Sequence, residues 1–228
     1  MLVGRRVRTH TGRRWAAIAL VAFGVLAGCG SSSVDRVAIV GDSLTANEEP
    51  YLGSALAPGY TPTFIVRNGG QIAGMSSLLQ NYIDADGTPG VAVADLGTMD
   101  ALAVTASTAP TSSGSALLQP LLAATSSIPC VVLTTVDLRA DVVRGDEVAA
   151  QINHRIVGLE RSDPTKYKVV DWNEFVSTLP GPSVATYLEP GGIEETASGA
   201  MWLSRVDYAA VRECGTTHQP TVIGSNPG

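Results

Sequence analysis

The chain has 228 residues, with 15 Lys and Arg against 21 Asp and Glu, and its formal net charge is −6. This length suits one domain with a full hydrophobic core. Because the sequence carries no basic stripe that could hold phosphates, its composition argues against nucleic acid as a partner.

The N-terminal segment combines five arginines with an apolar run from Trp15 to Val25. The run is shorter than the ~20 residues that span a bilayer, and behind positive charge it is typical of a secretory signal. It ends in Leu26-Ala27-Gly28-Cys29, which resembles the bacterial lipobox. The resemblance implies that residues 1–28 are removed and that Cys29 is lipidated. The protein would then be anchored at the outer face of the cytoplasmic membrane or in the cell envelope, and loss of the five arginines would change its net charge from −6 to −11.

The remaining chain alternates short apolar runs with helical patterns. Continuous β-branched and apolar runs of this length predict parallel strands buried on both faces. We expect strands at 36–40, 63–67, 91–96, 130–135 and 168–171, and helices at about 46–56, 75–85, 114–126, 144–161 and 197–213. In the last helix, Met201, Leu203, Val206, Ala210 and Val211 form an approximate apolar stripe. Strands that alternate with helices predict a three-layer α/β/α sandwich around a five-stranded parallel sheet.

The same patterns divide the chain into segments. We expect a signal over residues 1–28, a tether over 29–33, one domain over 34–214 and a flexible tail over 215–228. Residues 105–114 and 177–192 are expected to be loops. Cys130 and Cys214 remain once Cys29 carries lipid, and in an oxidising compartment they form a disulfide or stay as two buried thiols.

Ligand sites in such sheets lie beyond the carboxyl ends of the strands. The first strand ends in Gly41-Asp42-Ser43-Leu44, just before a helix. Ser43 can point its hydroxyl into the crevice there, and Asp42 can cap the backbone N–H groups of the helix. Trp172 and Asn173 follow the last strand, where they either line the crevice or pack at the corner of the sheet.

This motif and four later segments resemble the SGNH, or GDSL, hydrolases, which are flavodoxin-like esterases, lipases and deacetylases. The segments are IVGDSL at 39–44, VRNGGQIAGMSS at 66–77, VADLGTMDAL at 93–102, YKVVDWNEF at 167–175 and GGIEETASGAMWL at 191–203. The resemblance covers most of Val34 to Cys214. It implies the flavodoxin-like form of the predicted sandwich and an ester-hydrolase site at the strand ends.

The resemblance assigns roles residue by residue. Ser43 occupies the position of the nucleophile. Gly74, or alternatively Gly70, occupies the position of the glycine whose N–H belongs to the oxyanion hole. The second oxyanion donor is an Asn in the family, and here that position holds Met99, whose thioether has no N–H. The catalytic Asp and His positions hold Gly191 and Glu194. Asp100 is retained at a position that is mainly structural in the family.

Two histidines remain outside the signal as alternative bases. His154 lies in the middle of a predicted helix, where an exposed surface position explains it, and His218 lies in the predicted tail. A carboxylate, Glu194 or Glu195, could replace the imidazole only if burial raised its pKa toward neutrality. A simpler interpretation of these two carboxylates is an acidic entry to the last helix.

Two functions stay open. One is a lipid-anchored envelope protein that has lost hydrolase chemistry and binds an acylated or glycan ligand, or an envelope partner protein, through the old crevice. The other is an active ester hydrolase, acting on acyl or acetyl groups, that uses Ser43 with a non-standard base. The three substitutions at reactive positions favour the first. The sequence shows no metal-ligand spacing and no nucleotide fingerprint, so we expect no cofactor and no metal.

Overall fold

The computed structural model describes residues 35–106, 113–137 and 143–218. The predicted signal, the tether with Cys29 and most of the expected loop at 105–114 lie outside these residues. Within them, five parallel strands form one sheet in the order β2-β1-β3-β4-β5. This is the flavodoxin-like order, and the predicted fold class is confirmed.

The strands lie close to their predicted positions. They are β1 (Arg36–Gly41), β2 (Thr61–Val66), β3 (Val91–Asp95), β4 (Cys130–Thr134) and β5 (Tyr167–Val170). β1, β3 and β4 are almost entirely buried, whereas β2 and β5 are partly exposed because they form the two edges. In the parallel register Gly41 pairs with Asp95, so polar residues that follow each strand meet at one edge.

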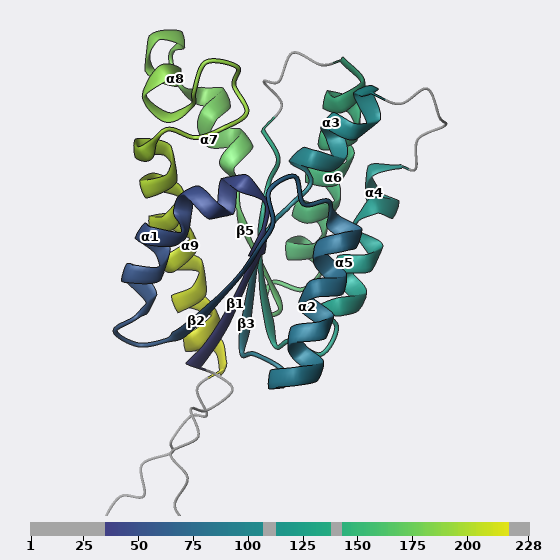
Figure 1. Ribbon diagram of the computed structural model, residues 1–228, viewed down its shortest axis with the longest axis vertical. Coiled ribbons are helices and arrows are strands. Elements are labelled where there is room, and N and C mark those ends of the chain that lie inside the picture. The colour runs from purple at the N-terminus through teal and green to yellow at the C-terminus, as the bar shows by residue number, and fades with distance from the viewer. Residues whose placement is uncertain (1–34, 107–112, 138–142, 219–228) are drawn as a thin grey trace, which may run out of the picture. The chain divides into compact units, whose positions relative to one another are not determined.

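Helices cover both faces of the sheet (Figure 1). α1 (Ser43–Leu56), α7 (Trp172–Thr178), α8 (Gly181–Tyr187) and α9 (Ala197–His218) lie on one side. α2 (Ile72–Asp86), α3 (Thr98–Ala106), α4 (Gly114–Leu117), α5 (Gln119–Ala124) and α6 (Val143–Ser162) lie on the other. The buried residues of each strand alternate between the two layers: Val37 and Ile39 pack toward α1 and α9, and Ala38 and Val40 toward α2 and α6.

Three helices were not predicted, and two others were predicted as one continuous helix. α3 begins directly after β3, α7 directly after β5, and α8 lies inside the segment expected to be a loop over 177–192. The helix expected over 114–126 is broken into α4 and α5 near Leu118, just before Pro120, which lacks a backbone N–H. All of these elements are shorter than ten residues, so their periodicity gives little signal.

The apolar stripe of α9 differs from its prediction. Leu203, Ala210 and Val211 are buried as expected, but Met201 is 37% exposed. The buried face instead includes Asp207 and Cys214. α9 also continues through Gly215 to His218, five residues beyond the end that we expected for this helix at residue 213.

Cys130 and Cys214 form a disulfide, with a Cα–Cα distance of 5.7 Å. Cys130 is the first residue of β4, so the bond ties the far end of α9 to the amino edge of the sheet. The strand ends that could carry a site lie at the opposite edge. The disulfide therefore stabilises the layer between sheet and α9 without contacting that edge.

We predict that replacing Cys214 with Ser lowers the free energy of unfolding by about 4 kcal/mol, because the bond closes a loop of 84 residues in the unfolded chain. Urea unfolding of wild type and Cys214→Ser, with and without reductant, measures this difference. In a Cys29→Ser background, the unfolded and unreduced protein should show no free thiol; two titratable thiols would contradict the bond.

Candidate active site at the carboxyl edge of the sheet

The first turn of α1 begins at the end of β1 and carries Ser43. Asp42 is the cap of this helix, and its Oδ1 accepts a hydrogen bond from the Leu44 N–H at 2.9 Å. The preceding Gly41 has no room for a side chain, because a Cβ there would lie 1.7 Å from the Thr45 hydroxyl oxygen. Gly41 and Asp42 are thus explained by the turn and the cap. Ser43 itself is half-buried as the first residue of the helix.

Asp100 connects two further elements at this edge. It lies in the first turn of α3, and its Oδ2 accepts a hydrogen bond from the Ile72 N–H at the start of α2, at 2.9 Å. The α2 cap position, Gln71, makes no side-chain cap of its own. Asp100 therefore supplies that cap from a neighbouring helix, which is a structural role.

The two glycines considered for the oxyanion hole differ in their surroundings. Gly70 is buried, and its N–H donates to the Arg67 carbonyl at 2.9 Å in the turn before α2. Gly74 is the third residue of α2, and an added Cβ there would meet nothing within 4 Å. The N–H of Gly70 is therefore already used, while that of Gly74 belongs to the first turn of a helix, where N–H groups lack intrahelical acceptors.

The segment before α9 turns its two glutamates in opposite directions. Leu188 and Glu195 form an antiparallel bridge, and the Glu189 N–H donates to the Glu194 carbonyl at 2.8 Å. Since adjacent residues of an extended strand face opposite sides, Glu194 is exposed and Glu195 is only 4% exposed. Gly191 has φ = 124°, a conformation that an Asp at this position would adopt only with strain.

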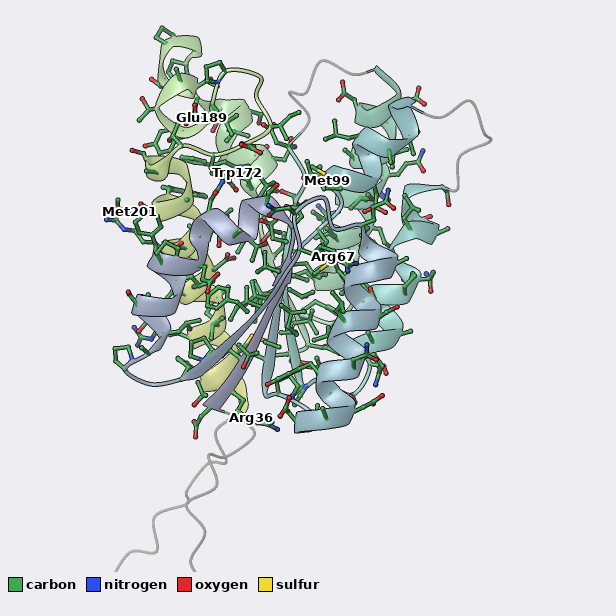
Figure 2. All side chains as sticks on the ribbon, in the orientation of Figure 1. Arg36, Arg67, Met99, Trp172, Glu189 and Met201 are labelled. Carbon is green, nitrogen blue, oxygen red and sulfur yellow. A yellow bond between two sulfur atoms is a disulfide. The ribbon has the colours of Figure 1, made fainter. Side chains whose placement is uncertain are left out.

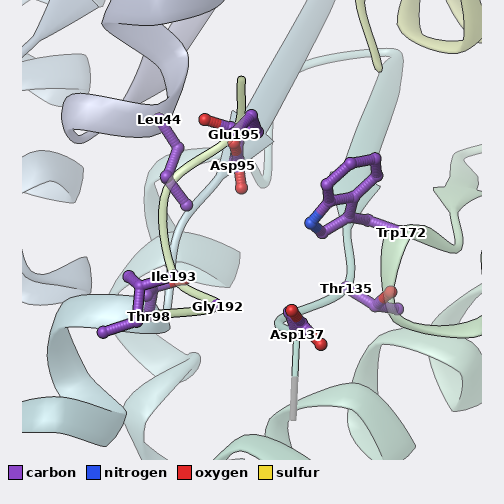
Figure 3. Close-up of a pocket in the computed structure, with 9 residues that line it drawn as sticks. All are labelled: Leu44, Asp95, Thr98, Thr135, Asp137, Trp172, Gly192, Ile193 and Glu195. Atoms are coloured by element: carbon purple, nitrogen blue, oxygen red, sulfur yellow. The ribbon is translucent and has the colours of Figure 1, made fainter. Parts of the chain in front are cut away.

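A small cleft, hereafter the strand-end cleft, lies at this edge (Figure 3). Its volume is about 330 Å³ with the open mouth included. Asp95 and Glu195 lie beside each other on its wall, and the indole nitrogen of Trp172 points into it. The remaining lining residues are Leu44, Thr98, Thr135, Asp137, Gly192 and Ile193.

Trp172 both packs and lines the cleft. Its ring lies 5.6 Å from those of Phe175 and Trp202, in a cluster that joins α7 to α9. The start of α7 is held in turn by Asp171, which accepts hydrogen bonds from the Thr135 hydroxyl and from the Glu174 N–H. The sequence left packing and cleft lining as alternatives for Trp172, and in the structure its side chain does both.

The histidines lie away from Ser43. His154 is exposed on α6, in the layer across the sheet from α1. The side chain of His218 lies outside the described residues, but its backbone ends α9, 21 residues after Ala197. At a rise of 1.5 Å per residue, that is about 30 Å along the helix, beyond the disulfide at the opposite edge. Figure 2 shows Trp172 and Met99 at the cleft edge and Arg36 at the opposite end.

Four carboxyl groups are buried next to this site, and of these the sequence reasoning had considered only Glu195, as an alternative to Glu194. We call Glu48, Asp95, Glu195 and Asp207 the acid cluster; they are 1%, 8%, 4% and 0% exposed. Burial raises the pKa of Glu195 to about 7 and that of Asp207 to about 7, and it raises those of Glu48 and Asp95 well above their usual range. Burial also raises the pKa of Asp42 to about 6, with the charges of Asp100 and Glu194 adding to the effect.

A signal for two of these residues was present in the sequence. Glu48 lies on the buried face of α1 with Leu44, Leu52 and Leu56, and Asp207 occupies a core position of α9. A carboxylate at a core position of an amphipathic helix is unusual unless it has a partner. Asp95 ends a buried strand, but Glu195 could not be separated from Glu194 without the bridge to Leu188.

Comparison with solved structures identifies the fold. A lipase/acylhydrolase from Enterococcus faecalis matches with a TM-score of 0.60 and 17% identity, over 81% of this chain and 97% of the other. A G-D-S-L family lipolytic protein from Veillonella parvula matches with a TM-score of 0.59 and 15% identity, over 75% and 94%. The chain has the SGNH/GDSL hydrolase fold.

A third SGNH-fold match is the catalytic domain of peptidoglycan O-acetyltransferase A from Streptococcus pneumoniae. Its TM-score is 0.57 and its identity 14%, over 80% of this chain and 95% of that domain. No protein-family model and no curated protein sequence matches the chain. At these identities the matches to solved structures establish the SGNH fold and leave the chemistry to be argued from the site.

The buried carboxyl groups predict a pH dependence of stability in metal-free buffer. The folded SGNH domain holds protons on Asp42, Glu195 and Asp207 up to pH values of about 6 and 7, whereas the unfolded chain releases them near 4. Because the folded state binds more protons in this window, the free energy of unfolding falls as the pH rises from about 4 through 7. Each pKa unit corresponds to about 1.4 kcal/mol.

We therefore expect a higher urea midpoint at pH 5 than at pH 8. Asp207→Asn should reduce the difference, because it removes one of the groups that titrate, while Glu189→Gln, an exposed control, should leave it unchanged. A midpoint that rises from pH 5 to pH 8 would contradict the prediction.

Proposed function

We propose that this protein is an exported, lipid-anchored SGNH-fold protein that binds an acylated or glycan ligand of the cell envelope, or an envelope partner protein, with little or no ester hydrolysis. The observation that supports the proposal is the residue at the position that the sequence resemblance assigns to the family's catalytic His. This residue is Glu194, an exposed carboxylate, and three residues earlier the backbone of Gly191 disfavours the family's Asp. Ser43 therefore has no imidazole–carboxylate pair from this segment to accept its proton.

The known rate losses for missing catalytic groups favour the loss of hydrolysis. A serine hydroxyl needs a neighbouring base to act as a nucleophile. Removing the base of a serine triad costs on the order of a million-fold in turnover, and a missing oxyanion donor costs ~100- to 1,000-fold. These losses need not multiply, but either one brings an esterase close to background.

Two observations support the proposed ligand class: the lipobox-like segment at Cys29 and the name of one structural relative. The segment at Cys29 favours an envelope location. No helix among the described residues is long and apolar enough to cross a membrane. One structural relative is named as a peptidoglycan O-acetyltransferase, which makes acetylated glycan a reasonable first ligand to test. The strand-end cleft offers Trp172 for stacking and Thr98 and Thr135 for hydrogen bonds.

We predict that a fluorophosphonate probe labels neither the wild-type protein nor Ser43→Ala above the background set by heat-denatured protein. Without a base, Ser43 should not attack the phosphonate within hours. Gel fluorescence after equal incubation measures this. Labelling of wild type that disappears in Ser43→Ala would overturn the proposal.

An active hydrolase with a carboxylate base is the second candidate, and one observation supports it. Of the two carboxylates considered as a base, Glu195 is buried, and burial raises its pKa to about 7, while the Asn47 side chain of α1 favours its charged form. Such a pKa suits a general base at neutral pH. Glu195 is therefore the one of the two to test.

The second candidate makes a separate prediction for short acyl esters. If Glu195 is the base, Ser43→Ala and Glu195→Gln should both reduce the rate of p-nitrophenyl acetate hydrolysis at least ~100-fold, and Glu194→Gln, its exposed neighbour, should retain it. Equal rates in wild type and Ser43→Ala would exclude this candidate. Under our main proposal all four proteins show the same background rate.

A further inference from the structure

The acid cluster has an unusual electrostatic environment. Its four carboxyl groups are each more than nine-tenths buried. The neighbouring charges that act most strongly on Glu48 and Asp95 are those of other carboxylates, not of Lys or Arg. Burying several carboxylates without positive charge is costly, so such groups are protonated, paired or bound to a metal.

Three members of the cluster bring oxygen atoms together from three separate elements. One carboxylate oxygen each from Glu48, Asp95 and Glu195 lie within 4.8 Å of one another. Calcium–oxygen distances are ~2.3–2.6 Å, so two ligands on opposite sides of the ion lie ~4.6–5.2 Å apart. The separations of the three oxygens are therefore in the range expected for ligands around an ion of calcium's size.

Buried polar atoms without a hydrogen-bond partner on the elements that carry these oxygens are a second observation. The Thr45 hydroxyl is fully buried without a hydrogen-bond partner. Thr45 lies one turn before Glu48 on the same buried face of α1 and packs against Gly41, whose register partner is Asp95. The Asp207 oxygens meet no N–H or hydroxyl donor, and their neighbour is the Glu48 carboxyl. Neutral hydroxyl and carboxylate oxygens together are the ligand set of a hard cation.

We propose that Glu48, Asp95 and Glu195 bind a divalent cation of calcium's size, with the Thr45 hydroxyl as a further oxygen donor. Asp207, whose neighbour is the Glu48 carboxyl, supports the site by adding negative charge. The proposal does not depend on whether Ser43 is active, because none of the ligands is needed for the nucleophile itself.

The site has a route for the ion. Asp95 and Glu195 line the strand-end cleft, where Figure 3 shows them beside each other. Glu195 also lines an outer groove between α1 and the start of α9, with Asn47, Glu189 and Glu194. Glu195 thus lines both hollows, so an ion can approach it from either side.

The proposed ion would hold together the parts of the molecule that carry the SGNH motifs. Glu48 belongs to α1, which begins at Ser43; Asp95 ends β3, before Met99 and Asp100; Glu195 belongs to the segment that leads into α9. Binding would replace protons in this layer with a metal charge and stabilise the folded state over the unfolded one.

The test uses purified protein freed of metals with EDTA, at pH 7.5. With a dissociation constant of ~0.1 mM, typical of extracellular calcium sites, 10 mM CaCl₂ should raise the melting temperature by roughly 5–10 °C. Tb³⁺, a luminescent substitute for calcium, should show emission when tryptophan is excited, because Trp172 lines the same cleft as Asp95 and Glu195. Excess calcium should remove that emission.

Three variants test whether the calcium shift and the Tb³⁺ emission come from the proposed site. Asp95→Asn and Glu195→Gln keep the side-chain volume and should fold, because they remove buried charge; each should abolish both the calcium shift and the Tb³⁺ emission. Glu189→Gln, an exposed carboxylate of the outer groove, should retain both. Retention of the response in Asp95→Asn and Glu195→Gln would place the ion elsewhere and overturn the proposal.

Two other results would also overturn it. The wild type could show no shift with calcium and no Tb³⁺ emission while its melting temperature still falls between pH 5 and pH 8; the carboxyls then share protons and bind no metal. A shift with MgCl₂ or ZnCl₂ at the same concentration but not with CaCl₂ would exclude an ion of calcium's size. Labelling by the fluorophosphonate probe is independent of either result, so the two proposals fail separately.

Discussion

Several carboxyl groups are buried between the sheet and the helices α1 and α9, and the charges that act most strongly on Glu48 and Asp95 are those of other carboxylates. Glu48, Asp95, Glu195 and Asp207 occupy positions between sheet and helices that an apolar side chain would fill in an ordinary core. Their repulsion has to be relieved by protons or by a cation. Either solution links the stability of the domain to its surroundings, through pH in the first case and through a dissolved ion in the second.

The fold at the carboxyl edge is held by interactions that do not require catalysis. Asp42 caps α1 and Asp100 caps α2 from a neighbouring helix, while Gly41 leaves room for Thr45. These are residues that make the chain resemble an SGNH hydrolase, and each has a structural reason to stay. The positions to which the sequence resemblance assigns chemical roles hold Met99, Gly191 and Glu194. Retention of the motif can therefore be explained by folding alone and does not require catalysis.

Much of the fold could be predicted because buried parallel strands leave continuous apolar runs, as in Cys130–Thr134. The strands fall within about two residues of their predicted bounds. The short helices α7 and α8 could not be predicted this way, since two turns carry little periodicity and are stabilised by the contacts of Trp172, Phe175 and Trp202. For the site, Ser43, Asp42 and Asp100 could be placed from the motifs. Glu195 could not be distinguished from Glu194, because only the bridge to Leu188 turns one inward and the other outward.

The five strands, the long helices α1, α2, α6 and α9 and the SGNH-like motifs could be predicted from the sequence, because each of these is a local pattern of side chains. The tertiary structure alone decided which carboxylates meet. Glu48, Asp95 and Glu195 are separated by 47 and 100 residues along the chain, and no spacing rule joins them. The sheet register, the packing of α1 on α9 and the bridge before α9 bring their oxygens within 4.8 Å of one another. Electrostatic energy depends on distance in space and on burial, and the one-dimensional pattern contains neither.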